Sequence, residues 1–162
     1  MKFFDEKRHL PPGWDWETLR TWLLWGHTLS LLSLFEFVSR YVRSLDSLYA
    51  YNQLLNGTMV KELIPGRCVQ PFWELMLGRP LWGAWIYLVL MVLQAYRHYH
   101  YHTVGSMSVY LMRRLPDRWE YHRRCWAVPV LSAIAELLIF GAAIFLCWLL
   151  WRFATPAGHL PL

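Results

Sequence analysis

The chain has few charged residues and few cysteines. Of its 162 residues 17% are charged, and its three cysteines, Cys68, Cys125 and Cys147, lie far apart and form no CxxC pair. This odd number and wide spacing exclude the disulfide framework of a small secreted domain. The sequence also lacks internal repeats, a glycine-rich phosphate loop, a nucleophile–base constellation and metal-ligand spacing. We therefore expect a protein that is not an enzyme and that needs no cofactor.

Hydrophobic and aromatic residues are abundant instead. The chain is 56% hydrophobic and contains 11 Trp and 9 Tyr. A soluble domain of this size does not usually combine so many tryptophans with so few charges. Trp and Tyr have an apolar body and a polar tip, which suits side chains at a membrane–water interface. The composition therefore favours an integral membrane protein.

Three apolar runs can cross a bilayer, which needs about 20 apolar residues. They cover approximately residues 19–38, 81–98 and 126–151. The N-terminal segment before the first run mixes acidic and basic residues, and this run is too long for the core of a signal peptide, so we expect a retained anchor. The sequence predicts an all-α protein: an integral membrane helical bundle with three transmembrane helices plus short interfacial helices, forming a single membrane domain over residues 1–162.

Each apolar run has, just before it or in its first turn, a residue that is typical of the beginning of a helix. Asp15 or Thr18 is a candidate cap for the first helix. Pro80 is a favoured first-turn residue for the second helix, which we expect to continue through Arg97 and His98. Pro129 is expected in the first turn of the third helix, where a missing N–H costs little.

The segment between the first two runs, residues 40–80, is expected outside the membrane. Arg67, Glu74 and Arg79 make a fourth crossing costly, so residues 71–78 are interpreted as a short interfacial helix. Residues 44–70 are interpreted as a surface connection with a turn at Asn56-Gly57. Glu36 and Arg40, four residues apart, are expected to form an ion pair.

Lysine and arginine are distributed unequally between the two sides that three crossings define. One side carries ten: Lys2, Lys7, Arg8, Arg20, Arg97, Arg113, Arg114, Arg118, Arg123 and Arg124. The other carries six: Arg40, Arg43, Lys61, Arg67, Arg79 and Arg152. Because cytoplasmic loops are enriched in Lys and Arg, we expect a multi-pass protein of the cell membrane with a cytoplasmic N-terminus, a cytoplasmic loop at 97–124 and an external C-terminus.

The basic loop at 97–124 contains a helix-start signal. Asp117 can cap a helix, and Glu120 stands three residues later, as in a capping box. We expect this helix to run into the third span, and residues 107–115 to form a further amphipathic helix. The candidate docking residues are Tyr110, Arg113, Arg114, Asp117, Arg118, Glu120, Arg123 and Arg124. Two interpretations stay open: the arginines contact lipid phosphates, or the loop docks a cytosolic protein. Nucleic acid is not an expected partner.

The run from His98 to His102 alternates His with Tyr. On a helix His98 and His102 share one face and His100 points nearly opposite. Two same-face histidines are too few for a closed metal site. A small membrane-bound haem- or metal-handling redox protein that uses this run is therefore an alternative, and histidines at a helix end near the interface are the simpler interpretation.

Glu136 and His27 are polar residues within the predicted spans. Glu136 lies about 15 Å into the third helix and His27 about 12 Å into the first, at 1.5 Å per residue. A carboxylate at that depth must face protein and find a partner. We predict that His27 and Glu136 meet, either inside the bundle or across a partner interface. Their role is either a structural hydrogen bond or the handling of a proton or substrate.

The segment from Ser106 to Arg124, SMSVYLMRRLPDRWEYHRR, resembles small multi-pass membrane proteins of Gram-positive gut bacteria that are associated with ABC (ABC-2-type) transporters. The resemblance implies a non-catalytic membrane subunit of an ABC-type transporter complex, with the basic loop contacting a cytosolic ABC ATPase or a membrane permease subunit. A full ABC-2 permease has about six spans and roughly twice this length, so a partner or a homo-oligomer is implied. A regulatory membrane interaction protein is a further alternative.

Overall fold

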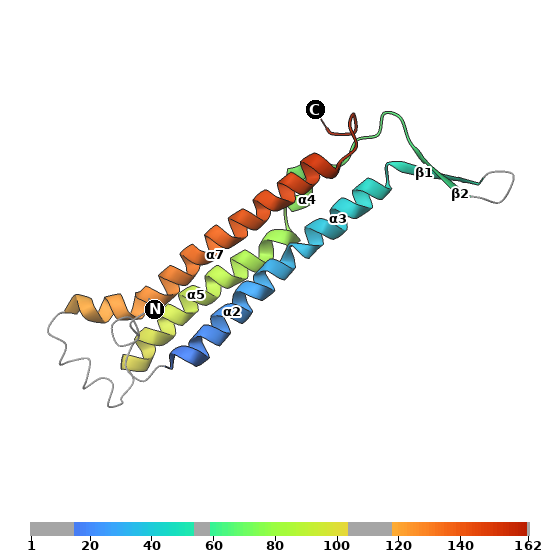
Figure 1. Ribbon diagram of the computed structural model, residues 1–162. Coiled ribbons are helices and arrows are strands. Elements are labelled where there is room, and N and C mark those ends of the chain that lie inside the picture. Colours follow the sequence, from blue (N-terminus) through green and yellow to red (C-terminus); the bar gives the residue numbers. More distant parts are fainter. Residues whose placement is uncertain (1–14, 54–58, 104–117, 162) are drawn as a thin grey trace, which may run out of the picture. The chain divides into compact units, whose positions relative to one another are not determined.

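The computed structural model describes residues 15–53, 59–103 and 118–161. Helices dominate this part of the chain, as an all-α fold requires, and one short β-hairpin accompanies them (Figure 1). The described residues form two compact units. The first unit contains residues 15–30, 84–103 and 118–140, and the second contains residues 31–53, 59–83 and 141–161. The single membrane domain expected over residues 1–162 stays a prediction.

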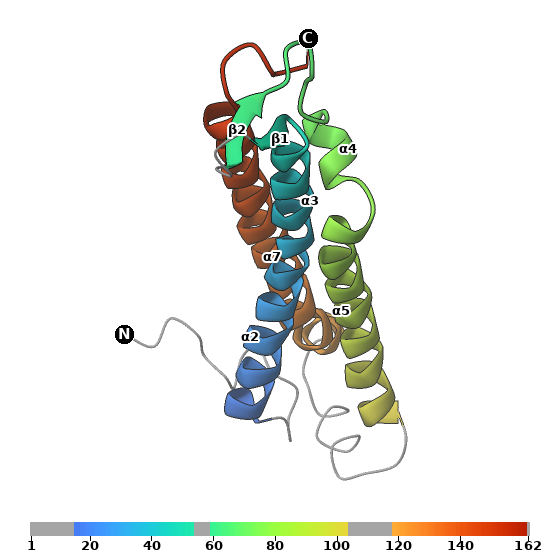
Figure 2. The ribbon, with the colours of Figure 1, turned by 90° about the vertical axis from the view of Figure 1, so that its right-hand side faces the viewer.

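The first unit is built from parts of three helices, α2 (Trp16–Ser33), α5 (Arg79–Thr103) and α7 (Arg118–Ala154), which lie side by side in two views (Figures 1 and 2). Asp15 caps α2: its Oδ2 accepts hydrogen bonds from the Thr18 backbone N–H at 3.0 Å and the Thr18 hydroxyl at 2.6 Å. A capping carboxylate also suits the positive end of the helix dipole. The structure thus selects Asp15 over Thr18 as the cap.

The first predicted span is interrupted. Residues 19–38 were expected in one helix, but α2 ends at Ser33 and α3 (Phe35–Asp46) begins after Leu34. The Leu34 backbone N–H donates to the Leu31 carbonyl, a tighter turn than the α-helix. The hydroxyl of Ser33 donates to the Pro80 carbonyl at 2.7 Å. This polar contact at the break had no sequence signal.

The third predicted helix is longer than its apolar run. The helix was expected to run from Asp117 into the span, and α7 is continuous from Arg118 to Ala154. The expectation that Pro129 lies in a first turn is therefore wrong, because Pro129 stands inside the helix. An interior proline removes one backbone hydrogen bond and kinks the helix. Figure 1 shows that α7 bends in its early turns.

The second unit contains α3, a β-hairpin, the short helix α4 (Phe72–Met76) and the last part of α7. Three residues of α3, Phe37, Tyr41 and Ser44, are buried at helical spacing, and the ring of Phe37 meets that of Phe72 edge-on at 5.5 Å. Glu36 and Arg40 form the expected ion pair at 3.2 Å. α4 confirms the short helix expected at 71–78.

The hairpin was not predicted. Strand β1 (Tyr49–Gln53) pairs antiparallel with β2 (Met59–Leu63), and Tyr51 lies opposite Lys61. The Lys61 ammonium lies 4.1 Å from the centroid of the Tyr49 ring and 3.4 Å from Asp46 Oδ1. Cross-strand and cation–π contacts of this kind stabilise an exposed hairpin. The turn expected at Asn56-Gly57 lies outside the described residues.

One described helix is long and apolar enough to cross a membrane: His122–Ala154, whose most apolar stretch has a mean hydropathy of 2.4. Its most apolar stretch is only 17% buried, whereas the core helix of a soluble protein is mostly buried. Three such helices were expected, and α2 and α5 do not reach the same hydropathy. Their Trp, Tyr, Gly and inward polar residues lower the mean over each helix.

Candidate functional site

A buried polar cluster joins the three helices of the first unit. Glu136 of α7 accepts hydrogen bonds on both carboxylate oxygens. Its Oε2 lies 2.6 Å from Nδ1 of His27 on α2, and its Oε1 accepts from the hydroxyl of Ser30, one turn further along α2. The other ring nitrogen of His27, Nε2, lies 3.0 Å from the hydroxyl of Tyr87 on α5. The contact predicted between His27 and Glu136 is present in the structure.

The carboxylate of Glu136 is buried, so each of its oxygens needs a hydrogen-bond donor from the protein. Glu136 is 1% exposed and Ser30 is 2% exposed. A buried carboxylate without donors costs several kcal/mol, so both oxygens need partners. An ionised Glu136 makes His27 Nδ1 the donor. In the neutral imidazole Nε2 then accepts from Tyr87, and in the imidazolium it donates. The Glu136–His27–Tyr87 chain can therefore hold a proton without leaving an orphaned atom.

Gly26 lets Tyr87 approach this closely. A Cβ built on Gly26 would lie 2.6 Å from Cε2 of Tyr87 and 2.9 Å from its Cδ2, closer than side-chain carbons pack. The Tyr87 ring stacks on the His27 ring with centroids 4.5 Å apart, and the Ser132 hydroxyl also hydrogen-bonds Tyr87. Sequence reasoning missed Tyr87 because it lies within an apolar and aromatic run in which nothing distinguishes it from its neighbours.

A second histidine compensates for the interior proline. Pro129 has no N–H, so it cannot donate to the Cys125 carbonyl four residues earlier. His98 of α5, fully buried, places Nδ1 3.0 Å from that carbonyl, and only an N–H donor is compatible with a carbonyl acceptor. Its Nε2 lies 3.0 Å from the amide nitrogen of Gln94, which then donates. His98 is thereby held as the Nδ1–H tautomer.

These bonds engage both ring nitrogens of His98, the first histidine of the predicted metal or haem run. The side chain of His102 lies outside the described residues. Nδ1 of His122, near the beginning of α7, lies 2.6 Å from the Tyr99 hydroxyl, and that hydroxyl accepts from the Trp126 indole N–H at 2.9 Å. Among the described residues no three His, Cys, Asp or Glu side chains come together as a metal site.

The predicted docking residues are only partly described. Tyr110, Arg113, Arg114 and Asp117 lie outside the described residues, as do the helix expected at 107–115 and the capping aspartate. Arg118 and Glu120 belong to the first turn of α7, and their side chains are not described. Arg123 is exposed and Arg124 is partly exposed, on the part of α7 that enters the apolar stretch.

Comparison with known proteins adds no relative. No family model matches the chain, and neither the curated proteins nor the solved structures contain a match.

We expect the His27–Glu136 pair to be energetically coupled. Glu136→Gln and His27→Gln should each lower the thermal stability of the purified protein, because each leaves a buried partner short of a charge-assisted hydrogen bond. The double variant should lose less than the sum, with a coupling energy of about 0.5–3 kcal/mol. Thermal unfolding of the four proteins in one detergent measures this cycle.

Thr28→Ala is the matched control, since Thr28 neighbours His27 but is exposed and donates to the Leu24 carbonyl of its own helix. It should leave stability nearly unchanged. Strict additivity of the His27 and Glu136 substitutions would show that the pair contributes nothing as a pair.

His98 should matter less when residue 129 has an N–H. His98→Leu removes the donor to the Cys125 carbonyl and should cost about 1–3 kcal/mol, the penalty for an unsatisfied buried acceptor. In the Pro129→Ala background the restored N–H can donate to Cys125, so the same substitution should cost measurably less. Thermal unfolding of the single and double variants tests this. Equal costs in the two backgrounds would refute the compensation between His98 and Pro129.

Proposed function

We propose that this chain is a membrane-embedded, non-catalytic subunit of an ABC-type transporter complex. The observation that carries the membrane part is the polarity of the first unit, where polar side chains lie inside and apolar ones outside. Glu136 is buried, while Leu138, two residues further along α7, is 70% exposed. Water-soluble units show the opposite arrangement, whereas intramembrane ionisable residues face the bundle interior and pair with one another.

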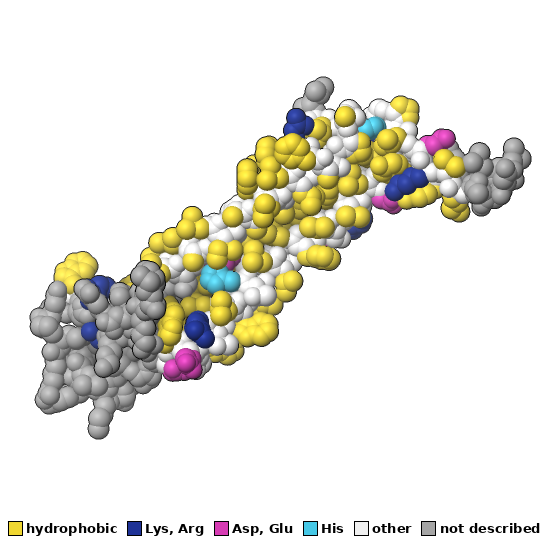
Figure 3. All heavy atoms as spheres, in the orientation of Figure 1, with side chains coloured by type: hydrophobic (Ala, Val, Ile, Leu, Met, Phe, Trp, Pro, Cys, Tyr) yellow, Lys and Arg dark blue, Asp and Glu magenta, His cyan; other side chains and the backbone are white. Residues whose placement is uncertain are grey.

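The same pattern on α2 and α5 supports three crossings. Ser30 of α2 faces Glu136, but Trp22, Trp25 and Leu29 of the same helix are largely exposed. On α5, Tyr87 is buried while Val89 and Val92 are exposed. Figure 3 shows hydrophobic side chains covering most of the helical surface in view, with few charged side chains among them. Contiguous apolar surface of this extent needs a covering, and acyl chains provide it.

Placing a reporter at each end of the chain tests the topology. Three crossings put the two ends on opposite sides, with the N-terminus cytoplasmic according to the distribution of Lys and Arg. We expect a cytoplasm-active reporter to work at the N-terminus and an export-active reporter to work at the C-terminus. The same result is expected if α7 alone crosses the membrane, so the reporters do not distinguish one crossing from three.

A cysteine at Met59 or Glu62 of the hairpin separates the two topologies. Both positions are exposed, and the segment 40–80 is external under three crossings but shares the side of the N-terminus under one. Labelling by an impermeant thiol reagent in intact cells is therefore expected, with Cys68→Ser as the background. Labelling only after lysis would contradict the three-crossing proposal.

The transporter part of the proposal is supported by the resemblance of Ser106–Arg124 and by size. The chain supplies at most three crossings, about half of those in a full ABC-2 permease, so transport needs a second membrane subunit or further copies. Mixed charge around Asp117 and Glu120 suits a protein surface better than lipid phosphates alone, which would attract only the arginines. The basic segment is therefore the proposed contact for a cytosolic ATPase.

Charge reversal tests the docking role. Arg113→Glu combined with Arg114→Glu should abolish co-purification of an ABC ATPase or permease with the C-terminally tagged chain in mild detergent, because the reversed charges repel the partner. Arg79→Glu with Arg152→Glu makes the same net charge change at positions proposed to be external, and it should leave the complex intact. Recovery of the complex from both double variants would contradict the docking role and favour the interpretation that the arginines of the loop contact lipid phosphates. Recovery of neither ATPase nor permease with the unaltered chain would favour a regulatory membrane protein.

A further inference from the structure

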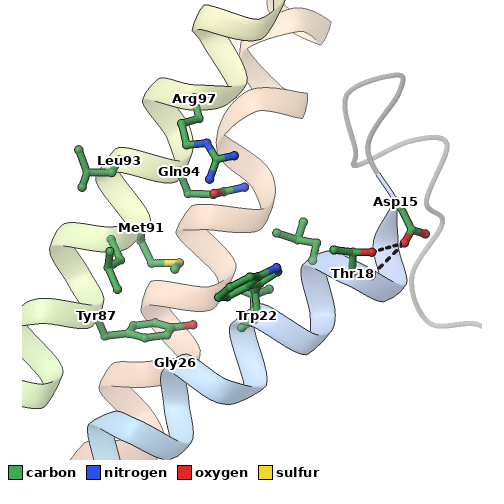
Figure 4. A pocket seen from close by; sticks show the side chains of 12 residues that line it. Asp15, Thr18, Trp22, Gly26, Tyr87, Met91, Leu93, Gln94 and Arg97 are labelled. Carbon is green, nitrogen blue, oxygen red and sulfur yellow. Dashed lines mark hydrogen bonds between the residues drawn. The ribbon is translucent and has the colours of Figure 1, made fainter.

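A cavity of about 730 Å³ lies between α2 and α5 in the first unit. Figure 4 shows side chains from both helices around it, with Trp22 from α2 and Met91 and Leu93 from α5. Ligand sites typically have 300–1,000 Å³, mostly apolar walls and a few polar groups that orient the ligand. The size and composition of this cavity are those of a binding site.

The two ends of the cavity differ in polarity. Its polar lining residues come from the first turn of α2, Asp15 and Thr18, and from the later turns of α5, Gln94 and Arg97. The opposite end is formed by Gly26 and Tyr87, where the close approach of the two helices described above narrows the space. Leucine side chains of both helices line the part between. A ligand that matches this cavity has one polar end and one apolar end.

The polar end of the cavity carries charges of both signs. Among the described residues lining the cavity, Asp15 is the carboxylate and Arg97 the cation. The Thr18 hydroxyl and then its backbone N–H hydrogen-bond the Asp15 carboxylate and lower the pKa of that group. The lowered pKa keeps Asp15 ionised beside the positive end of α2, and among the described lining residues Arg97 is the one whose charge suits an anion. A guanidinium presents donors in a fork that matches the oxygens of a phosphate.

The dimensions match one leaflet of a bilayer. Arg97 and Tyr87 stand ten residues apart on α5, which is about 15 Å along a helix. Half of a hydrocarbon core of about 30 Å has the same length. In the proposed topology Arg97 lies where the second span meets the cytoplasmic loop, at the level of the lipid phosphates. An acyl chain that enters at this level can extend along the cavity towards Tyr87.

We propose that this cavity binds one membrane phospholipid, with its phosphate on Arg97 and one acyl chain along the leucines between α2 and α5. The proposal rests on the membrane placement of the proposed function. The lipid covers apolar side chains that α2 and α5 leave open, and its acyl chain ends against Tyr87, the residue that holds His27. A bound lipid would therefore stabilise the close packing of α2 against α5, and the buried polar cluster depends on that packing.

Binding of two defined lipids to the full chain in mild detergent tests this site. The probes are phosphatidylglycerol and a diacylglycerol with identical acyl chains but no phosphate, with bound lipid counted by native mass spectrometry. One phosphatidylglycerol per chain is expected, and diacylglycerol should bind about tenfold more weakly because it lacks a charge-assisted bond. Arg97→Gln should make the two affinities equal, whereas Arg123→Gln, on an exposed arginine outside the cavity, should change neither.

A bulky side chain in the cavity tests the acyl site separately. Leu90→Trp should reduce binding of both lipids at least tenfold, because Leu90 lines the cavity and the indole fills it. Val89→Trp is the control, since Val89 is a neighbouring exposed residue of α5 outside the lining. Both variants should retain the thermal unfolding of a folded chain. Equal lipid binding by Leu90→Trp and Val89→Trp would overturn the cavity proposal, as would equal binding of the two lipids to the unaltered chain.

Extraction of cell membranes with alkaline carbonate distinguishes this proposal from the membrane placement. A chain that resists extraction but shows no binding dependent on Arg97 and Leu90 would overturn the lipid site alone. A chain released by carbonate would overturn the membrane placement, and with it the origin proposed for the lipid.

Discussion

The burial of one carboxylate constrains the whole first unit. Glu136 is enclosed between helices, and each of its oxygens needs a donor. Ser30 and His27 of α2 supply them, and His27 is in turn held by Tyr87 of α5. Since an uncompensated buried charge costs several kcal/mol, α2 and α5 cannot rotate or slide without breaking this chain of contacts. The register of three helices is thus set by one polar side chain, where apolar packing alone would tolerate several alternatives.

A second buried acceptor, the Cys125 carbonyl, also receives its hydrogen bond from a histidine. Pro129 leaves a carbonyl of α7 without its intrahelical donor, and His98 of α5 donates to it from outside the helix. In the first cluster the two ring nitrogens of His27 contact two other helices, α7 and α5. In the second, one ring nitrogen of His98 reaches α7 and the other is held by Gln94 of its own helix. The two histidines that looked like candidates for chemistry are therefore bound into helix packing. The Glu136–His27 pair adds the capacity to hold a proton, because it can exist as an ion pair or as a neutral pair.

An interior that is polar and a surface that is apolar point to lipid as the surrounding medium. This distribution unites the three proposals. In the proposed topology acyl chains surround the spans, one of those chains occupies the cavity between α2 and α5, and the arginines of the basic segment are available to lipid phosphates or to a cytosolic partner. As the proposed transporter subunit, the chain would act through the partners and lipid that it binds.

Composition and periodicity determined the helical class, the three apolar runs, the extension of α5 through His98 and the continuity of α7 from its basic start. They also determined that Glu136 needs a partner at the depth of His27, because both depths follow from the rise per residue. The tertiary structure decided the rest. Tyr87 and the cavity depend on the close approach that Gly26 allows between two helices, the break at Leu34 coincides with a hydrogen bond to Pro80, and the hairpin is held by cross-strand contacts of Lys61. Each of these joins residues distant in sequence, and periodicity along one helix carries no information about which side chain of another helix it meets.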